Sequence, residues 1–323
     1  MTQATPIDIP ARSATRNLTT ALADIKLAHS VFALPFALLA AFLAASPFSN
    51  WARFSGQLTL ILCCMVLART WAMLLNRLAD RRIDADNPRT ARRALAAGRL
   101  SPRAGWTIAS LCALLFLAVC AAFLLIYDNP WPITLAPLVL AWLALYAYTK
   151  RFTFLCHFFL GSALAISPIA AVIAIDPAHL AMSATSLAFS APISPTAIAV
   201  AFLALFVLLW VAGFDIAYAL QDLDFDRSTG LHSVPARFGW RGALWIARAL
   251  HALAFTALIL AINTAPPLNT ITYAAAALVA ALLIFEHIVL TKRGVAGIPM
   301  AFFTLNGFIS LVLGAAGITD TLM

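Results

Sequence analysis

The sequence predicts an all-α integral membrane protein, a bundle of nine transmembrane helices. Three observations predict this fold class. Of the 323 residues, 63% are hydrophobic and only 11% are charged, whereas soluble domains carry about 25% charged residues. Apolar runs of about 20 residues recur from end to end, which is the length that a helix needs to cross a bilayer. Lysine and arginine gather in alternate connections between these runs.

The apolar runs define one transmembrane domain over residues 25–323, preceded by a polar N-terminal arm over residues 1–24. The first run ends in AFLAASPFS, which resembles the end of a signal peptide. It follows a long polar leader and exceeds a typical signal core, so we expect a retained helix. The continuous runs do not fit the short alternating strands of an outer-membrane barrel. The expected helices are 25–47, 55–79, 103–126, 131–149, 153–175, 196–221, 242–263, 270–290 and 297–318.

The positive charges predict the orientation of the bundle. With the N-terminus inside, the loops on the opposite side hold only Arg53. This asymmetry is the positive-inside pattern, and it predicts an inside N-terminus and an outside C-terminus. The net charge of +8 is then explained by contact with an anionic lipid bilayer, with no role for nucleic acid. The inside set is Arg12, Arg16, Lys26, the 77–103 block, Lys150, Arg151, Arg227, Arg237, Arg241, Lys292 and Arg293.

Seven of the thirteen carboxylates lie in two short segments at predicted cytoplasmic helix ends. In the first segment, Asn76, Asp80 and Asp84 follow one another at intervals of four. Such residues fall within about 80° of one another on a helix. Three oxygen-bearing side chains therefore share one face. Asp86 lies off this stripe and is better interpreted as a solvated loop charge.

The second acidic segment reads DIAYALQDLDFD. On a continuous helix, Asp215, Asp222 and Asp226 fall within about 40°, and Tyr218 lies close to that stripe. Asp224 lies off it. Clustered carboxylates repel one another and are costly at a membrane boundary, so a cation should compensate them.

Oxygen ligands of this kind suit a hard cation, Mg²⁺ before Ca²⁺ or Mn²⁺. Mg²⁺ takes one or two carboxylates and completes its shell with water and substrate phosphates. Two such clusters on the same membrane face therefore predict a pair of Mg²⁺ sites that hold a diphosphate. The expected ligands are Asn76, Asp80, Asp84, Asp222 and Asp226. The sequence contains no His/Cys metal spacing, P-loop or GxSxG nucleophile.

These residues resemble the UbiA superfamily of intramembrane aromatic prenyltransferases. The first acidic motif, NRLADRRID, and the second, YALQDLDFD followed by GLHSVPARFG, are similar to the two motifs of that family. The resemblance extends over about 25–315, with DNPRTARRALAAGRLS and KLAHSVFALPFALLAA contributing. Arg77 is a departure, because many members have Asp there. The variant is similar to a bacterial branch of the family, which implies the bacterial cytoplasmic membrane.

The resemblance implies transfer of a polyprenyl group from a polyprenyl diphosphate to the ring of an aromatic acid, 4-hydroxybenzoate or a 1,4-dihydroxy-6-naphthoate, in ubiquinone or menaquinone biosynthesis. Asp80, Asp84, Asp222 and Asp226 then carry the catalytic Mg²⁺, which stabilises the charge growing on the leaving diphosphate. Lys150 and Arg151 are candidates for binding the diphosphate, or they are plain positive-inside anchors.

Arg69 lies seven residues before Asn76, on the same helix face and about 10 Å deeper. The resemblance implies that Arg69 binds the carboxylate of the aromatic acid; the alternative is a salt bridge with Asp215, and both can hold in turn. Tyr218 orients ring or diphosphate oxygens, or it packs with one hydrogen bond. Glu286 and His287 form a proton relay or, as we favour, an interfacial pair with Lys292 or Arg293. His29, His157 and His251 are interpreted as helix-packing histidines.

Two other function classes are disfavoured by the residues. CDP-alcohol phosphotransferases need a continuous DGxxAR…GxxxDxxxD element, and the sequence has none. A non-enzymatic transporter is expected to show internal repeats and helices broken at mid-membrane, whereas the charges here lie at helix ends. The acceptor, the prenyl chain length, the oligomeric state and the role of the 176–195 loop are not determined by the sequence.

Overall fold

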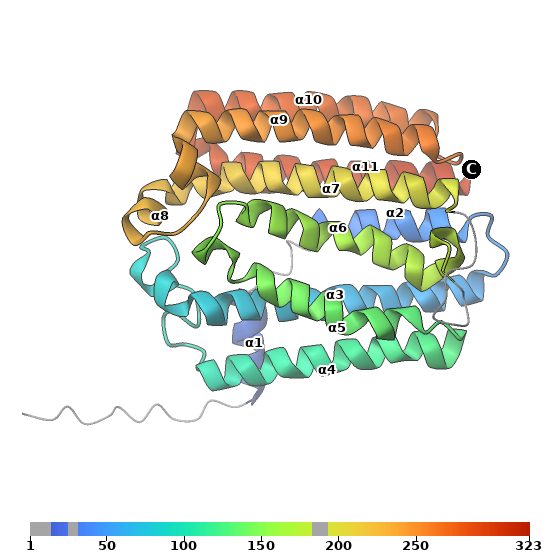
Figure 1. Cartoon of the computed structure of the whole chain (residues 1–323), viewed down its shortest axis with the longest axis horizontal. Coiled ribbons are helices and arrows are strands. Elements are labelled where there is room, and N and C mark those ends of the chain that lie inside the picture. Colours follow the sequence, from blue (N-terminus) through green and yellow to red (C-terminus); the bar gives the residue numbers. More distant parts are fainter. Residues whose placement is uncertain (1–13, 25–31, 183–192) are drawn as a thin grey trace, which may run out of the picture.

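The computed structural model describes residues 14–24, 32–182 and 193–323, and these are almost entirely helical. Long apolar helices run antiparallel to one another along the molecule (Figure 1). The α-helices are α1 Ala14–Asp24, α2 Leu34–Ala45, α3 Trp51–Asp86, α4 Pro102–Tyr127, α5 Trp131–Tyr146, α6 Cys156–Ile175, α7 Pro195–Ala219, α8 Leu223–Thr229, α9 Val234–Thr264, α10 Thr270–Arg293 and α11 Asn306–Leu322.

The predicted transmembrane helices correspond to helices of the structure in order. Within the described ranges, eight helical segments are long and apolar enough to cross a membrane. The first predicted helix, 25–47, is represented by α2, which has 12 residues, and residues 25–31 of that prediction lie outside the described residues. The last predicted helix begins as a π-helical segment, Met300–Leu305, before α11. The all-α membrane bundle is therefore confirmed, with nine as an approximate count.

Helix α7 lies at the centre of the bundle. Ser194 caps its first turn by accepting a hydrogen bond from the Ala197 amide at 3.1 Å, and Pro195 follows, where a missing amide proton costs nothing. Trp210 is fully buried, and its indole donates to Asn306 Oδ1 of α11 at 2.7 Å. A Cβ atom on Gly161 of α6 would lie 2.3 Å from the Leu208 carbonyl oxygen of α7. The glycine therefore permits the close contact between α6 and α7.

Part of the predicted N-terminal arm is helical. Helix α1 packs through Ala21 and Leu22 on apolar residues of α3 and of the segment between α3 and α4. Asp24, at its end, accepts a hydrogen bond from the Ala94 amide at 2.8 Å and lies 3.7 Å from the Arg77 guanidinium. Arg77, which departs from the family motif, therefore contacts α1.

Two opposite ends of the bundle differ in polarity. Helix α8 and the segment between α3 and α4 lie together at one end, on the left of Figure 1. We call this the acidic end, because the two Asp clusters lie there. Helix α10 finishes at the same end with Lys292 and Arg293, while Arg53, in the first turn of α3, lies at the other. The alternation of helices thus gathers the loop cations from Arg77 onward at one end, as the sequence predicted. Arg12, Lys26 and residues 183–192 of the 176–195 loop lie outside the described residues.

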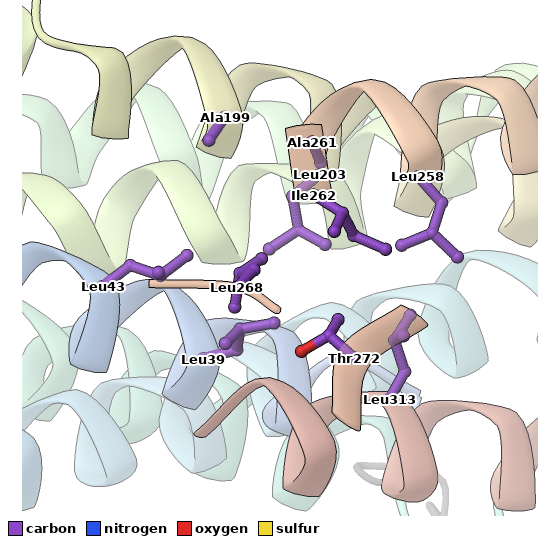
Figure 2. Close-up of a pocket in the computed structure, with 10 residues that line it drawn as sticks. All are labelled: Leu39, Leu43, Ala199, Leu203, Leu258, Ala261, Ile262, Leu268, Thr272 and Leu313. Atoms are coloured by element: carbon purple, nitrogen blue, oxygen red, sulfur yellow. The ribbon is translucent and has the colours of Figure 1, made fainter. Parts of the chain in front are cut away.

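A small cavity lies in the apolar core between α2, α7, α9, α10 and α11. Its volume is about 10 Å³, roughly that of one water-sized sphere. Figure 2 shows its lining of aliphatic side chains and one oxygen, from Thr272. That hydroxyl donates to Asp320 at 2.6 Å. A space this small does not hold a long hydrocarbon, so this region is packed core.

Glu286 does not form the expected interfacial pair. Its side chain is fully buried, with neither carboxylate oxygen hydrogen-bonded within the described part of the chain, whereas Lys292 and Arg293 are exposed. Lys292 lies six residues further along α10, which puts it about 120° away around the helix, and Arg293 lies about 10 Å away along the axis. His287 instead contacts His251 of α9, with ring nitrogens 3.0 Å apart.

Candidate active site

The first acidic cluster lies on the last turns of α3. This helix is continuous from Trp51 to Asp86, and Asn50 caps its start by accepting a hydrogen bond from the Arg53 amide at 2.9 Å. Asp80 and Asp84 face inward and are 1% and 3% exposed. Asn76 lies one turn before Asp80, with its amide nitrogen 3.5 Å from Asp80 Oδ2. The predicted Asn-Asp-Asp face is therefore present, with both aspartates buried and Asn76 half-buried.

Asp80 is neutralised by two basic side chains from the turn between α5 and α6. Lys150 Nζ lies 2.5 Å from Asp80 Oδ2, and Arg151 Nη2 lies 2.8 Å from Asp80 Oδ1. Arg151 also donates to the backbone carbonyls of Ala79 and Ala147, each at 2.9 Å. A buried carboxylate needs such partners, because an unpaired buried charge is strongly destabilising. Lys150 and Arg151 are thus part of the acidic end.

Asp84 is paired with Arg93, which comes from the segment that follows α3. Arg93 Nη1 donates to Asp84 Oδ1 at 2.7 Å. The Thr90 hydroxyl donates to the Asp84 backbone carbonyl at 3.1 Å, which folds the segment back over the end of the helix. Residues 87–100 therefore cover the first acidic cluster.

The second cluster begins where α7 ends. The α-helix stops at Ala219, a short 3₁₀ turn covers Leu220–Asp222, and α8 begins at Leu223. The prediction of one continuous helical stripe is wrong at this point, because the tighter turn rotates Asp222 and Asp226 relative to Asp215. Ser233, the cap of α9, donates through its hydroxyl to Asp226 Oδ2 at 2.8 Å. Asp226 is therefore linked to the start of α9.

Asp222 is bound by two residues that follow α3 directly. Asn87 Nδ2 donates to Asp222 Oδ1 at 3.0 Å. Arg89 makes a two-point ion pair with both carboxylate oxygens, with its Nε 2.8 Å from Oδ1. Arg89 Nη1 also donates to the Tyr218 hydroxyl at 3.1 Å. The ends of α3 and α7, which are distant in sequence, are joined by these contacts.

The charge of Arg89 is secured by this environment. Burial works against a charged guanidinium, but the hydrogen bond to Asp222 and the attraction of that carboxylate outweigh it, and the pKa of Arg89 lies above its usual value. Arg89 therefore stays protonated wherever Asp222 is ionised. Its guanidinium carbon also lies 5.4 Å from the centre of the Tyr218 ring.

Asp215 lies deeper and pairs with a histidine. Its Oδ2 is 2.7 Å from His157 Nδ1 of α6, and the Val234 amide donates to His157 Nε2 at 3.2 Å. His157 is 2% exposed. The tautomer consistent with these contacts carries a proton on Nδ1 and leaves Nε2 as the acceptor. His157 thus joins α6, α7 and α9.

Arg69 lies on α3 as predicted, two turns before Asn76 and toward the middle of the helix. The alternative salt bridge between Arg69 and Asp215 is not formed, because Asp215 contacts His157 instead. Tyr218 packs with one hydrogen bond, which is the second of its two predicted roles. Its ring packs at 4.2 Å from the Phe302 ring, and its hydroxyl accepts from Arg89.

Sequence reasoning missed five polar residues at this end: Asn87, Arg89, Arg93, His157 and Ser233. Arg89 and Arg93 lie four residues apart, but they contact aspartates of different motifs, Asp222 and Asp84. His157 was interpreted as a packing histidine. No periodic pattern marks Asn87 or Ser233, because their contacts depend on how the loops fold.

The oxygen donors fit a divalent cation. Four carboxylates lie at one end, and each is paired with a basic side chain or a hydroxyl group. No three His, Cys, Asp or Glu side chains converge on a single point in the described ranges. Mg²⁺ typically takes one or two carboxylates from a protein and its remaining ligands from water and phosphate, so the predicted Mg²⁺ ligands stay a prediction.

Comparisons with known proteins identify the family of this chain. The profile of the UbiA prenyltransferase family matches residues 33–312. The chain is 29% identical over 263 residues to the 4-hydroxybenzoate octaprenyltransferase of Edwardsiella ictaluri (strain 93-146), covering 80% of this chain and 82% of that protein.

Two solved structures share the fold. The apo structure of a UbiA homologue from Aeropyrum pernix K1 superposes with a TM-score of 0.76 and 32% identity, covering 90% of this chain and 98% of that one. A UbiA homologue from Archaeoglobus fulgidus bound to GPP and Mg²⁺ has a TM-score of 0.66 and 18% identity, covering 94% and 100%. The chain therefore belongs to the UbiA prenyltransferase family and is a multi-pass membrane prenyltransferase.

Proposed function

We propose that this protein transfers a polyprenyl group from a polyprenyl diphosphate to the ring of an aromatic acid, with 4-hydroxybenzoate as the first candidate acceptor, in quinone biosynthesis. The observation that carries the proposal is the pairing of basic side chains with Asp80 and Asp222 at one end of the bundle. The name of the Edwardsiella ictaluri relative and the GPP and Mg²⁺ bound to the Archaeoglobus fulgidus homologue support it.

The acidic end supplies what ionisation of an allylic diphosphate requires. The reaction breaks the allylic C–O bond, forms a carbon–carbon bond at the ring and releases one ring proton. Asp80, Asp84, Asp222 and Asp226, with Asn76, are the residues that would hold Mg²⁺. When bound, Mg²⁺ neutralises the charge that develops on the diphosphate.

The basic residues at this end would bind the diphosphate. Lys150, Arg151 and Arg89 already lie beside the carboxylates. If the carboxylates held Mg²⁺, these basic side chains would be available to the diphosphate oxygens. Preorganised charges of this kind stabilise a transition state without reorganising during the reaction. Tyr218 would position an oxygen of the ring or the diphosphate from the same place.

The acceptor is expected deeper in the bundle than the diphosphate. Arg69 lies on α3 about 10 Å from Asn76 along the axis, and we propose that it binds the carboxylate of the aromatic acid. The polyprenyl chain lies among apolar side chains, away from water that would quench an allylic cation. The positive-inside pattern supports a cytoplasmic position for the acidic end, in the bacterial inner membrane.

Product analysis tests the proposal. Membranes containing the protein are supplied with a long-chain polyprenyl diphosphate, Mg²⁺, and either 4-hydroxybenzoate or 1,4-dihydroxy-6-naphthoate, and the products are identified by mass. We expect a prenylated 4-hydroxybenzoate whose formation requires Mg²⁺. A prenylated naphthoate alone would favour the menaquinone alternative, and no product from either acceptor would contradict the aromatic assignment.

Charge-removing variants connect the reaction to the site. Asp80→Asn and Asp222→Asn should each lower the rate by about 100-fold, since each removes part of a preorganised charge array. Asp86→Asn is the matched control, because Asp86 lies on α3 but is exposed. Equal rates in Asp80→Asn, Asp222→Asn and the unaltered protein would contradict the proposed metal site.

A further inference from the structure

A second polar feature lies outside the candidate active site, in a groove between α9 and α10. These helices are side by side along the edge of the bundle opposite α4 in Figure 1. The groove has a volume of about 550 Å³, within the range of about 300–1,000 Å³ typical of sites for small molecules.

The lining of this groove changes from basic to apolar along the helices. Near the acidic end lie Arg248 of α9 and Lys292 of α10, with the Arg248 Nη2 donating to the Thr291 hydroxyl at 2.8 Å. One turn further in, His251 and His287 contact each other.

Beyond the histidines the lining is hydrocarbon, contributed by Phe255, Ala280, Leu283 and Ile284. The distance from Lys292 to Ala280 along α10 is about 18 Å. The groove is therefore amphipathic along its length, with cations at one end and an apolar trough behind them.

The charge at the polar end is unbalanced. The residues that line the groove include Arg248 and Lys292 but no aspartate or glutamate. Arg248 lies 4.7 Å from the ring of Trp245, which is 68% exposed. Exposed tryptophan beside arginine is typical of the bilayer interface, where headgroup phosphates lie. Basic pockets between transmembrane helices at that level bind anionic headgroups.

We propose that this groove binds an anionic glycerophospholipid. The headgroup phosphate contacts Arg248 and Lys292, and one acyl chain lies along Phe255 and Ile284. The charge complementarity selects an anionic lipid, and the trough behind the cations selects a molecule with a hydrocarbon tail. A polyprenyl diphosphate fits less well, because the groove offers no carboxylate to hold the Mg²⁺ that accompanies a diphosphate.

Native mass spectrometry of the full-length protein in detergent tests this proposal. The probes are phosphatidylglycerol and phosphatidylcholine with identical acyl chains. The first variant, Arg248→Ala with Lys292→Ala, removes both cations. The second, Ala252→Trp, fills the groove without changing its charge, since Ala252 lines it and is exposed. The control, Arg241→Ala with Arg293→Ala, removes two exposed arginines at the same end that do not line the groove.

We expect the unaltered protein and the control to retain phosphatidylglycerol in preference to phosphatidylcholine. The first variant should weaken the phosphatidylglycerol adduct by about tenfold or more, through the loss of two charges at the headgroup. Ala252→Trp should weaken the adducts of both lipids. Unchanged adducts in both variants, or an equal loss in the control, would overturn the proposal. So would displacement of phosphatidylglycerol by geranylgeranyl diphosphate without Mg²⁺, which would make the groove a prenyl diphosphate site.

Discussion

Arg89 and Asp222 form a two-point ion pair that joins the segment following α3 to the end of α7. The pair brings the two acidic motifs of the sequence to one place. The Asp222 carboxylate is thereby bound to a guanidinium, so a divalent cation at the proposed site would compete with Arg89 for the same oxygens. This competition leads to the first prediction.

The variant Arg89→Gln should bind Mg²⁺ more readily than the unaltered protein. Hydrogen bonds to charged groups contribute about 1.5–3 kcal/mol, and their removal frees Asp222 for the metal. The Mg²⁺ concentration at half-maximal prenyl transfer is expected to fall by about tenfold. The measurement is a Mg²⁺ titration at saturating prenyl diphosphate.

Arg92→Gln is the control for this titration. Arg92 lies in the same segment and is exposed, and its side chain is not among those that contact Asp222. Its Mg²⁺ requirement should match that of the unaltered protein. A higher Mg²⁺ requirement in Arg89→Gln would show that Arg89 assists metal binding, contrary to the prediction.

The effects of substituting Asp80 and Arg151 on the unfolding free energy should not be additive, because the two side chains form an ion pair. Arg151→Met leaves the buried Asp80 with Lys150 as its remaining ion-pair partner, and we expect a loss of about 1–3 kcal/mol in unfolding free energy. Asp80→Asn in the same protein removes the charge that needs a partner. The double variant should therefore be more stable than Arg151→Met, as read from thermal melting in detergent. Simple additivity of the two losses would show that the charges are not coupled.

Arg69→Ala should change the KM values of the two substrates by different amounts. If Arg69 binds the acceptor carboxylate, the KM for the aromatic acid should rise by about tenfold or more, since a charge-assisted contact is lost. The KM for the polyprenyl diphosphate should change little. Arg53→Ala is the matched control, because Arg53 lies on α3 at the opposite end. Equal increases in both KM values would refute an acceptor-specific role.

His157→Ala should destabilise the protein through two lost contacts. Asp215 loses its partner at 2.7 Å and the Val234 amide loses its acceptor, at a cost of about 1–3 kcal/mol in unfolding free energy. Thermal melting measures the loss, and His232→Ala, at an exposed imidazole, should melt like the unaltered protein. A melting temperature for His157→Ala equal to that of His232→Ala would mean that the Asp215 contact contributes no stability.

The sequence by itself determined the class of the fold and the faces of single helices. Apolar runs identify membrane helices because an unpaired backbone in lipid is costly. The interval of four between Asn76, Asp80 and Asp84 places them on one face, because a helix repeats every 3.6 residues. Charge asymmetry likewise assigned Lys150 and Arg151 to the same end as the aspartates.

Only the tertiary structure determined which polar side chains contact one another. Arg89 and Asp222 are 133 residues apart in the sequence, and His157 and Asp215 are 58 residues apart. The helical repeat relates residues of one helix only, so it cannot predict these pairs. The break at Leu220–Asp222 and the inward turn of Glu286 also depend on packing between helices. Periodicity fixes where a side chain points around its own axis, but only the docking of one helix on another determines which charge it meets.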